Sequence, residues 1–172
     1  ISDNQLKISA KAIALGAADD DVTIDASQLT GSNSVEMDIK DTSATTAASN
    51  ITLTGSDNAD KITLEQAKAA SDSILTVTSG KGDDTITVKT TDSQDGVVVV
   101  TAGDGADTID VTGATSDAAT GSDITGGKGN DTIKLDTEGA ATDFTVVFGS
   151  SLANNGLDTI TNFVLGTAGD HV

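Results

Sequence analysis

The chain contains no cysteine, proline, arginine, tryptophan or tyrosine, and only three phenylalanines among its 172 residues. Without cysteine it has neither a disulfide framework nor a zinc–thiolate site. Its single histidine, His171, lies next to the C-terminal end, so a histidine-dependent triad or a multi-histidine metal centre lacks its parts. The aromatic platforms of a carbohydrate-processing groove are also missing. The sequence therefore predicts that the protein is not an enzyme.

The charge is almost entirely of one sign. Against 9 basic residues stand 27 acidic ones, 24 Asp and 3 Glu, which gives a net charge of −18. An acidic helical protein would favour Glu, the better helix former, whereas Asp belongs in turns, caps and metal loops. Such a surface repels nucleic-acid phosphates, so the composition indicates cations rather than nucleic acid as partners. No apolar run is long enough to span a bilayer, and we expect no membrane insertion.

A six-residue turn rich in glycine and ending in aspartate occurs four times. Its copies occupy residues 55–60, 79–84, 102–107 and 126–131. The final aspartate recurs after 24, 23 and 24 residues, and each copy leads into a short alternating strand. A fixed period of this size is the signature of a solenoid. We therefore predict an all-β fold, a right-handed parallel β-helix or β-roll solenoid with coils of about 24 residues.

Each coil also carries a second strand before its turn. Alternation of apolar and polar residues predicts these strands at residues 74–78, 97–101 and 122–125. A disordered acidic chain is the alternative reading of the composition, and the strand-like runs argue against it when calcium is present. One short helical insert is expected over residues 63–70, because Thr63 and Gln66 would form a capping box at its start.

The whole chain is expected to form one continuous solenoid domain. Its parts are degenerate N-terminal coils, a calcium-binding repeat core and C-terminal coils, over residues 1–50, 51–135 and 136–172. In the first part, residues 16–24 fit the turn-plus-strand pattern with Asp20 in the place of the final aspartate, and Val35, Met37 and Ile39 alternate like a strand. Because the chain begins without Met, we expect it to be a fragment of a longer protein.

The repeated turn has the composition of a calcium loop. Equivalent aspartates on successive coils would face each other at about 4.8 Å, the strand spacing, and would repel one another without a counterion. Ca²⁺ takes roughly six to eight oxygen ligands and mixes carboxylates with backbone carbonyls. Glycine at the second and fourth places of the turn lets those carbonyls point at an ion. The alternative is that the sequence is only a good turn, but four copies in phase favour the metal.

Four turns enclose three intervals, which predicts three or more Ca²⁺ ions between coils. The predicted ligand residues are Asp60, Asp84, Asp107, Asp131, Asn58, Gly80, Gly82, Gly103, Gly105, Gly127 and Gly129. The first turn carries Ser56 and Asn58 where the others carry glycine, so the site at that end should be weaker. Asp158 would extend the series by one more site. Aspartates on the other connections, such as Asp123 and Asp136, are interpreted as solvated charges.

These turns resemble the Gly-Gly-x-Gly-x-Asp-x-apolar-x repeats of the RTX (repeats-in-toxin) family. All nine places are matched by Gly126-Gly127-Lys128-Gly129-Asn130-Asp131-Thr132-Ile133-Lys134. The resemblance implies calcium-bound parallel β-rolls that Gram-negative bacteria export by type I secretion, with the sixth-place aspartate and turn carbonyls as ligands. The motifs here are separated by about 24 residues instead of running in tandem. That spacing and the Cys-free, Thr/Ala/Asp-rich composition are more similar to RTX-type bacterial surface-layer (S-layer) proteins.

The resemblance implies a calcium-binding structural segment of a secreted surface-layer protein on the cell surface of a Gram-negative bacterium. Calcium would drive folding after export and then lattice assembly. The expected partners are copies of the same protein in a two-dimensional lattice, and cell-surface polysaccharide bound through regions outside this chain. Two alternatives stay open: the calcium-dependent repeat region of a secreted adhesin, and the accessory calcium domain of an exported enzyme.

Overall fold

The computed structural model describes residues 5–13, 21–42, 49–66, 73–90, 96–114, 121–136, 144–149 and 155–163. In these segments the chain forms β-strands and no helix. One sheet contains seven strands, in spatial order β1 (Gln5–Ile13), β3 (Ser34–Asp41), β5 (Lys61–Gln66), β7 (Thr85–Thr90), β9 (Thr108–Gly113), β11 (Thr132–Lys134) and β13 (Thr159–Thr161). The other contains β2 (Val22–Asp25), β4 (Ile51–Thr54), β6 (Ile74–Lys81), β8 (Val97–Asp104), β10 (Ser122–Lys128) and β12 (Phe144–Val146).

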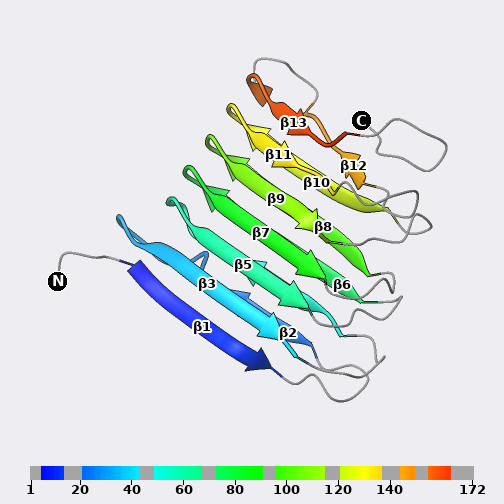
Figure 1. Ribbon diagram of the computed structural model, residues 1–172. Coiled ribbons are helices and arrows are strands. Elements are labelled where there is room, and N and C mark those ends of the chain that lie inside the picture. The colour runs from blue at the N-terminus through cyan, green and yellow to red at the C-terminus, as the bar shows by residue number, and fades with distance from the viewer. Residues whose placement is uncertain are drawn as a thin grey trace.

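Successive strands of the chain alternate between the two sheets, and neighbours within each sheet pair in parallel. The coils therefore stack in chain order from the N-terminal to the C-terminal end (Figure 1). In the seven-stranded sheet the register aligns Ile62 with Ile86, then with Ile109 and Ile133. This register repeats every 24, 23 and 24 residues, as the turn spacing predicted. The prediction of an all-β parallel solenoid is confirmed.

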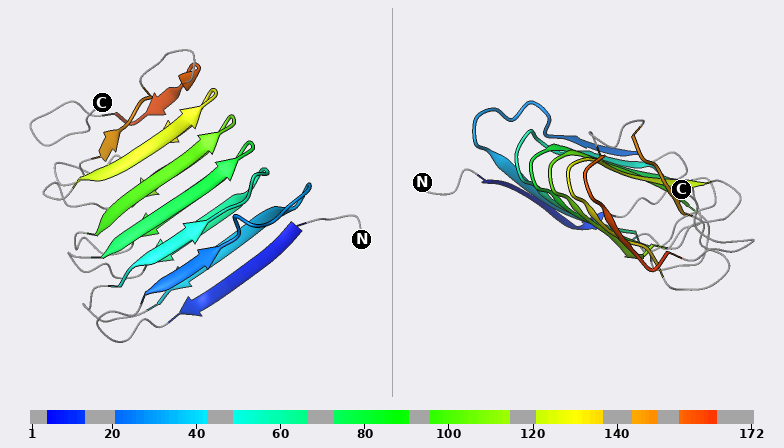
Figure 2. Two further views of the ribbon diagram at one scale, coloured as in Figure 1. Left: turned by 180° about the vertical axis from the view of Figure 1, so that it is seen from behind. Right: turned by 90° about the horizontal axis from the view of Figure 1, so that it is seen from above.

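The core lies between the two sheets, which face each other when the solenoid is viewed from above (Figure 2). Side chains of a strand alternate between its faces, and the inward positions hold aliphatic residues that are fully buried. One inward column of the six-stranded sheet contains Leu53, Val77, Val100, Ile124 and Val146. Because each coil covers the apolar face of the next, burial depends on stacking, as in other repeat proteins.

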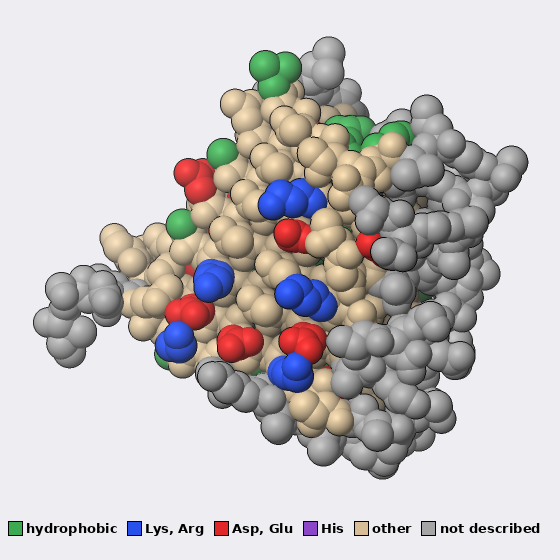
Figure 3. Space-filling view, viewed as in Figure 1, with side chains coloured by type: hydrophobic (Ala, Val, Ile, Leu, Met, Phe, Trp, Pro, Cys, Tyr) green, Lys and Arg blue, Asp and Glu red, His purple; other side chains and the backbone are tan. Residues whose placement is uncertain are grey.

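The outer face of the seven-stranded sheet carries lysines interspersed with acidic side chains (Figure 3). Among the described residues, ion pairs on this face join neighbouring coils: Lys7 with Glu36, Lys40 with Glu65, and Lys134 with Asp110. Opposite charges on adjacent strands of one face attract, and like charges would repel. These pairs therefore favour the observed register while leaving both partners at the surface.

The predicted helical insert is wrong for residues 63–66. Thr63 and Gln66 belong to β5, in which buried side chains alternate with exposed or half-buried ones, and Leu64 pairs in register with Ile39 and Val88. Packing between two neighbouring coils outweighs a local helix signal of this strength. Residues 67–70 lie outside the described residues, and no described segment forms a helix able to cross a membrane.

The reading of residues 16–24 is also corrected. Val22–Asp25 form β2, which pairs with β4 in the sheet that precedes each turn, not in the sheet that follows it. The turn of this coil therefore comes after Asp25, and Asp20 lies outside the described residues. The strand predicted from Val35, Met37 and Ile39 is confirmed as β3.

Candidate metal centre

The sixth-place aspartates form a continuous column on one side of the solenoid. Each immediately precedes a strand of the seven-stranded sheet, so the register that aligns those strands also aligns the aspartates. We call this column, Asp60, Asp84, Asp107, Asp131 and Asp158, the aspartate ladder. Four of the five are nearly inaccessible, with 1–3% of their surface exposed, and Asp158 at the C-terminal end is half-buried.

One oxygen of every ladder carboxylate is used to join two coils. Oδ1 accepts a hydrogen bond from the main-chain N–H of the corresponding residue in the preceding coil. These bonds run from the N–H of the first residue to Oδ1 of the second: Val35 to Asp60 (2.7 Å), Asp60 to Asp84 (2.7 Å), Asp84 to Asp107 (2.8 Å), Asp107 to Asp131 (2.9 Å) and Asp131 to Asp158 (3.0 Å). The ladder is thus part of the coil-to-coil hydrogen bonding, a role that the turn sequence does not indicate.

The second oxygen is left without a hydrogen bond in three members. Oδ2 of Asp84, Asp107 and Asp131 is buried and accepts no hydrogen bond. The nearby Ser79 hydroxyl, which partly offsets the rise that burial causes in the pKa of Asp84, donates to the carbonyl oxygen of Ala102 at 2.9 Å. A buried acceptor without a partner costs about 1–3 kcal/mol, and more when it is charged. These are the buried side-chain atoms of the ladder that still require a partner, and they repeat once per coil.

Burial also disfavours the charged form of these carboxylates. Removal from water, with smaller contributions from nearby carboxylates such as Asp60 and Asp83, raises the pKa of Asp84 to about 6. The pKa of Asp107 rises to about 7, mainly through burial and further through the charges of Asp84 and Asp131. Burial raises the pKa of Asp131 as well. A proton or a cation at the free oxygens would relieve this penalty.

Close contact between coils explains the glycines at the second and fourth places. A β-carbon added to Gly103 would lie 1.9 Å from the carbonyl oxygen of Gly80, and φ of Gly103 is +122°. The same conflict, at 1.8–2.4 Å from main-chain atoms of the preceding coil, applies to Gly80, Gly82, Gly105, Gly127 and Gly129. Carbonyl oxygens therefore lie at the contact between successive turns, where they can complement the carboxylates as metal ligands.

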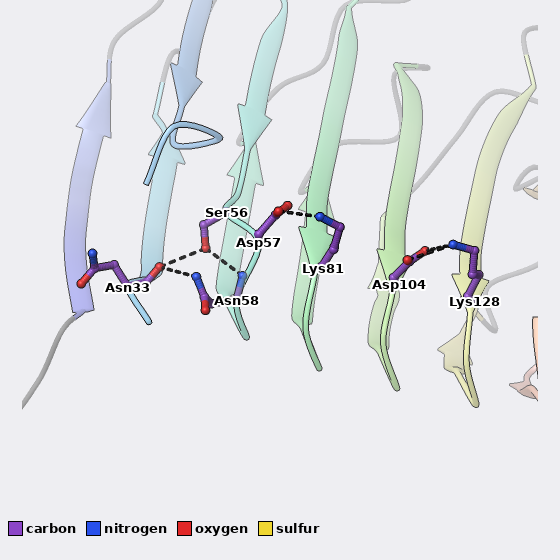
Figure 4. A network of polar contacts seen from close by, with 7 residues as sticks. All are labelled: Asn33, Ser56, Asp57, Asn58, Lys81, Asp104 and Lys128. Atoms are coloured by element: carbon purple, nitrogen blue, oxygen red, sulfur yellow. Dashed lines mark hydrogen bonds and ion pairs between the residues drawn. The ribbon is translucent and has the colours of Figure 1, made fainter. Parts of the chain in front are cut away.

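The third place of the turn alternates in charge from coil to coil. Lys81 lies 2.5 Å from the carboxylate of Asp57, and Lys128 lies 2.9 Å from that of Asp104 (Figure 4). Both pairs are largely exposed, and their lysines neutralise third-place aspartates, not the ladder. Within the described part of the chain the free ladder oxygens therefore have no hydrogen-bonding or ion-pairing cation.

Asn58 and Asp60, two of the predicted ligands, differ from the rest. The side-chain amide of Asn58 donates to the carbonyl of Asn33 at 3.0 Å, and so contacts the preceding turn. Both carboxylate oxygens of Asp60 already accept hydrogen bonds. Free acceptors are thus concentrated at Asp84, Asp107 and Asp131.

An oxygen-only donor set of this kind suits a hard cation such as Ca²⁺, which binds carboxylates and carbonyls. No group of three or more His, Cys, Asp or Glu side chains gathers around a common point among the described residues. A cation at the ladder would therefore take two carboxylates at most from adjacent coils and complete its shell with carbonyls and water. The residues fit such an ion, with Oδ2 of Asp84, Asp107 and Asp131 as the open positions.

Other buried polar residues were not predicted. Asp41, Gln66 and Thr90 align at the far end of the seven-stranded sheet and are 0%, 1% and 6% exposed. Asp136, interpreted from the sequence as solvated, is 7% exposed, whereas Asp123 is at the surface. These positions adjoin connections that vary from coil to coil, so no repeated sequence signal marks them.

Comparison with known proteins adds no assignment: no family model, no curated protein and no solved structure matches this chain. The function of the chain is therefore inferred from the residues of the turns themselves.

Proposed function

We propose that this chain is a calcium-binding structural segment of a secreted bacterial surface-layer protein. The observation that carries the proposal is the free, buried Oδ2 of Asp84, Asp107 and Asp131, repeated in register along the solenoid. These oxygens are buried and accept no hydrogen bond from the described residues. A divalent cation between successive turns would supply the missing partner and the missing positive charge.

Calcium is the cation that this donor set favours. The turns offer carboxylate and carbonyl oxygens, the ligands that Ca²⁺ accepts in flexible geometry, and no thiolate, because the chain has no cysteine. Bound Ca²⁺ would neutralise ladder charge and link one coil to the next. Since the site exists only when the coils stack, binding free energy would become folding free energy.

The surface-layer role rests on the resemblance of the turns and composition to RTX-type surface-layer proteins. Little free calcium is present inside a cell, so the chain would reach its full stability only after type I secretion and then associate with other copies. A rod of stacked coils with regular outer faces suits side-by-side packing in a sheet. The two alternatives, an adhesin repeat region and an accessory domain of an exported enzyme, would also bind calcium but would not assemble into a lattice.

A calcium titration of metal-stripped protein, followed by circular dichroism and light scattering, tests the proposal. We expect β-structure to increase with Ca²⁺ and particle size to grow over the same or a slightly higher range, while Mg²⁺ has a weaker effect. The matched control is the variant Asp84→Asn/Asp107→Asn/Asp131→Asn. Each asparagine keeps an oxygen that can accept the main-chain N–H bond from the preceding coil, but the negative charges are removed. Complete β-structure in chelator, unchanged by Ca²⁺, would refute the calcium role. Folding into a stable monomer would refute lattice assembly and favour the adhesin or accessory-domain alternative.

A further inference from the structure

The first member of the aspartate ladder is saturated by the protein itself. Oδ2 of Asp60 accepts a hydrogen bond from the main-chain N–H of Ser56 at 2.5 Å. Oδ1 accepts one from the N–H of Val35 at 2.7 Å, and the Ser56 hydroxyl lies 2.9 Å away. The carboxylates of Asp84, Asp107 and Asp131 have no counterpart to this Oδ2 bond. Asp60 therefore lacks the free oxygen that marks the other three.

The backbone of the first turn explains the difference. The second-place residues Gly80, Gly103 and Gly127 have φ angles of +114°, +122° and +111°. Ser56 occupies the same place but stays outside the left-handed region, which a side chain with a β-carbon rarely enters. Its turn therefore follows another path, and in that path the Ser56 N–H points at the Asp60 carboxylate.

The side chains of Ser56 and Asn58 fix this turn to the coil before it. Both point toward the carbonyl oxygen of Asn33, at 3.2 Å from the Ser56 hydroxyl and 3.0 Å from the Asn58 amide (Figure 4). The Ser56 hydroxyl has a single proton, which it can give to Asn33 or to Asp60, and it accepts the N–H of Asn58 at 3.2 Å. Neutral N–H and O–H donors thus surround the position at which a cation would meet Asp60.

We propose that residues 55–60 form a cap built from protein at the N-terminal end of the cation ladder. Ser56 and Asn58 supply hydrogen-bond donors in place of a bound Ca²⁺, so cation binding begins at Asp84 and not at Asp60. This inference rests on the proposed calcium role of the ladder. It changes the expected ligand set, because a predicted ligand, Asp60, becomes a structural carboxylate.

The Ser56 N–H and a bound Ca²⁺ would compete for the same oxygen, Oδ2 of Asp60. A main-chain N–H directed at Oδ2 places its positive end where a cation would sit. Two or three of the roughly four acceptor sites of the Asp60 carboxylate are already used by protein donors. Glycine at both places would allow the left-handed turn of the other coils. It would turn the second-place N–H away and leave Asp60 Oδ2 free.

The test counts bound ions by equilibrium binding of Ca²⁺ alone, with circular dichroism of each variant at saturating Ca²⁺. Asp60→Asn should bind as many ions as the wild type, whereas Asp107→Asn should bind fewer. Ser56→Gly/Asn58→Gly should gain one ion, and adding Asp60→Asn to that variant should remove it. Ser56→Ala/Asn58→Ala is the matched control, because it keeps a β-carbon and should gain none.

The outcomes separate the cap from the proposed function. Loss of one ion in Asp60→Asn, or no gain in the double-glycine variant, would overturn the cap while Ca²⁺ binding by the wild type stands. No uptake of Ca²⁺ by the wild type would overturn the calcium role, and the cap with it.

Discussion

The main-chain N–H of Asp84 donates a 2.8 Å hydrogen bond to Oδ1 of Asp107, the equivalent residue one coil further along. Asp107 therefore holds two coils together with one oxygen while its other oxygen, Oδ2, is buried without a donor. The same carboxylate serves as a structural acceptor and as an uncompensated charge. These two roles respond differently to substitution, to pH and to cations.

The structural role predicts that Asp107→Ala destabilises the protein with or without calcium. Loss of Oδ1 leaves the buried N–H of Asp84 unpaired, which should cost about 1–3 kcal/mol of unfolding free energy. Asp107→Asn keeps an oxygen for that N–H and removes the buried charge. It should cost less than alanine in chelator, and urea unfolding of the two variants measures the difference. Equal losses for Asn and Ala would contradict the hydrogen-bonding role.

The charge predicts an unusual dependence of stability on pH in the metal-free protein. Burial raises the pKa of Asp84 to about 6 and that of Asp107 to about 7, above the value of 3.8 for an ordinary aspartate. Between about pH 4 and 7 the folded protein thus holds protons that the unfolded chain has released. Its free energy of unfolding should be highest near pH 4, fall as the pH rises to 7, and then level off.

Urea unfolding of metal-stripped protein at several pH values in this range measures the effect. Asp84→Asn/Asp107→Asn/Asp131→Asn is the matched variant, since it removes the three ladder carboxylates whose pKa burial raises and should flatten the profile. A wild-type stability that rises between pH 4 and 7 would show that these carboxylates are not desolvated.

Coil contact at the turns predicts a large effect of a single methyl group. Gly103→Ala would place its β-carbon 1.9 Å from the Gly80 carbonyl oxygen at a φ of +122°. Gly121 also has a positive φ, +68°, but no atom lies within 4 Å of its added β-carbon. We expect Gly121→Ala to cost about 1 kcal/mol from backbone strain alone, and Gly103→Ala to cost several times more. Similar denaturation midpoints for the two variants would mean that the coils are not in contact at Gly103.

The repeated features were the predictable ones. The period of the final aspartates gave the register that aligns Ile62, Ile86 and Ile109, because identical coils stack with identical residues opposite one another. The bond from one aspartate N–H to the next carboxylate had no sequence signal, since it depends on how closely the coils approach. Asp41 was missed for the same reason: its burial follows from the neighbouring coil, not from a motif. The helix predicted to begin at Thr63 is not formed over residues 63–66, because contacts between coils outweigh a local capping pattern.

The alternating charges at the third place of the turns predict that reversing one charge lowers stability in a salt-dependent way. Lys128 lies 2.9 Å from Asp104, but the two side chains are 58% and 45% exposed. Solvent screening limits such a pair to about 1 kcal/mol or less. Lys128→Asp would place two carboxylates opposite each other and should lower the urea midpoint at low ionic strength. Because Asp104 also faces Lys81 in register, only reversing the whole column, in Asp57→Lys/Lys81→Asp/Asp104→Lys/Lys128→Asp, restores alternating charges and should recover that loss. In 1 M NaCl, where the Debye length is about 3 Å, the differences between the three proteins should shrink strongly. A loss that persists in high salt, or that the reversed column fails to recover, would show that Lys128 acts through packing of its aliphatic chain and not through its charge.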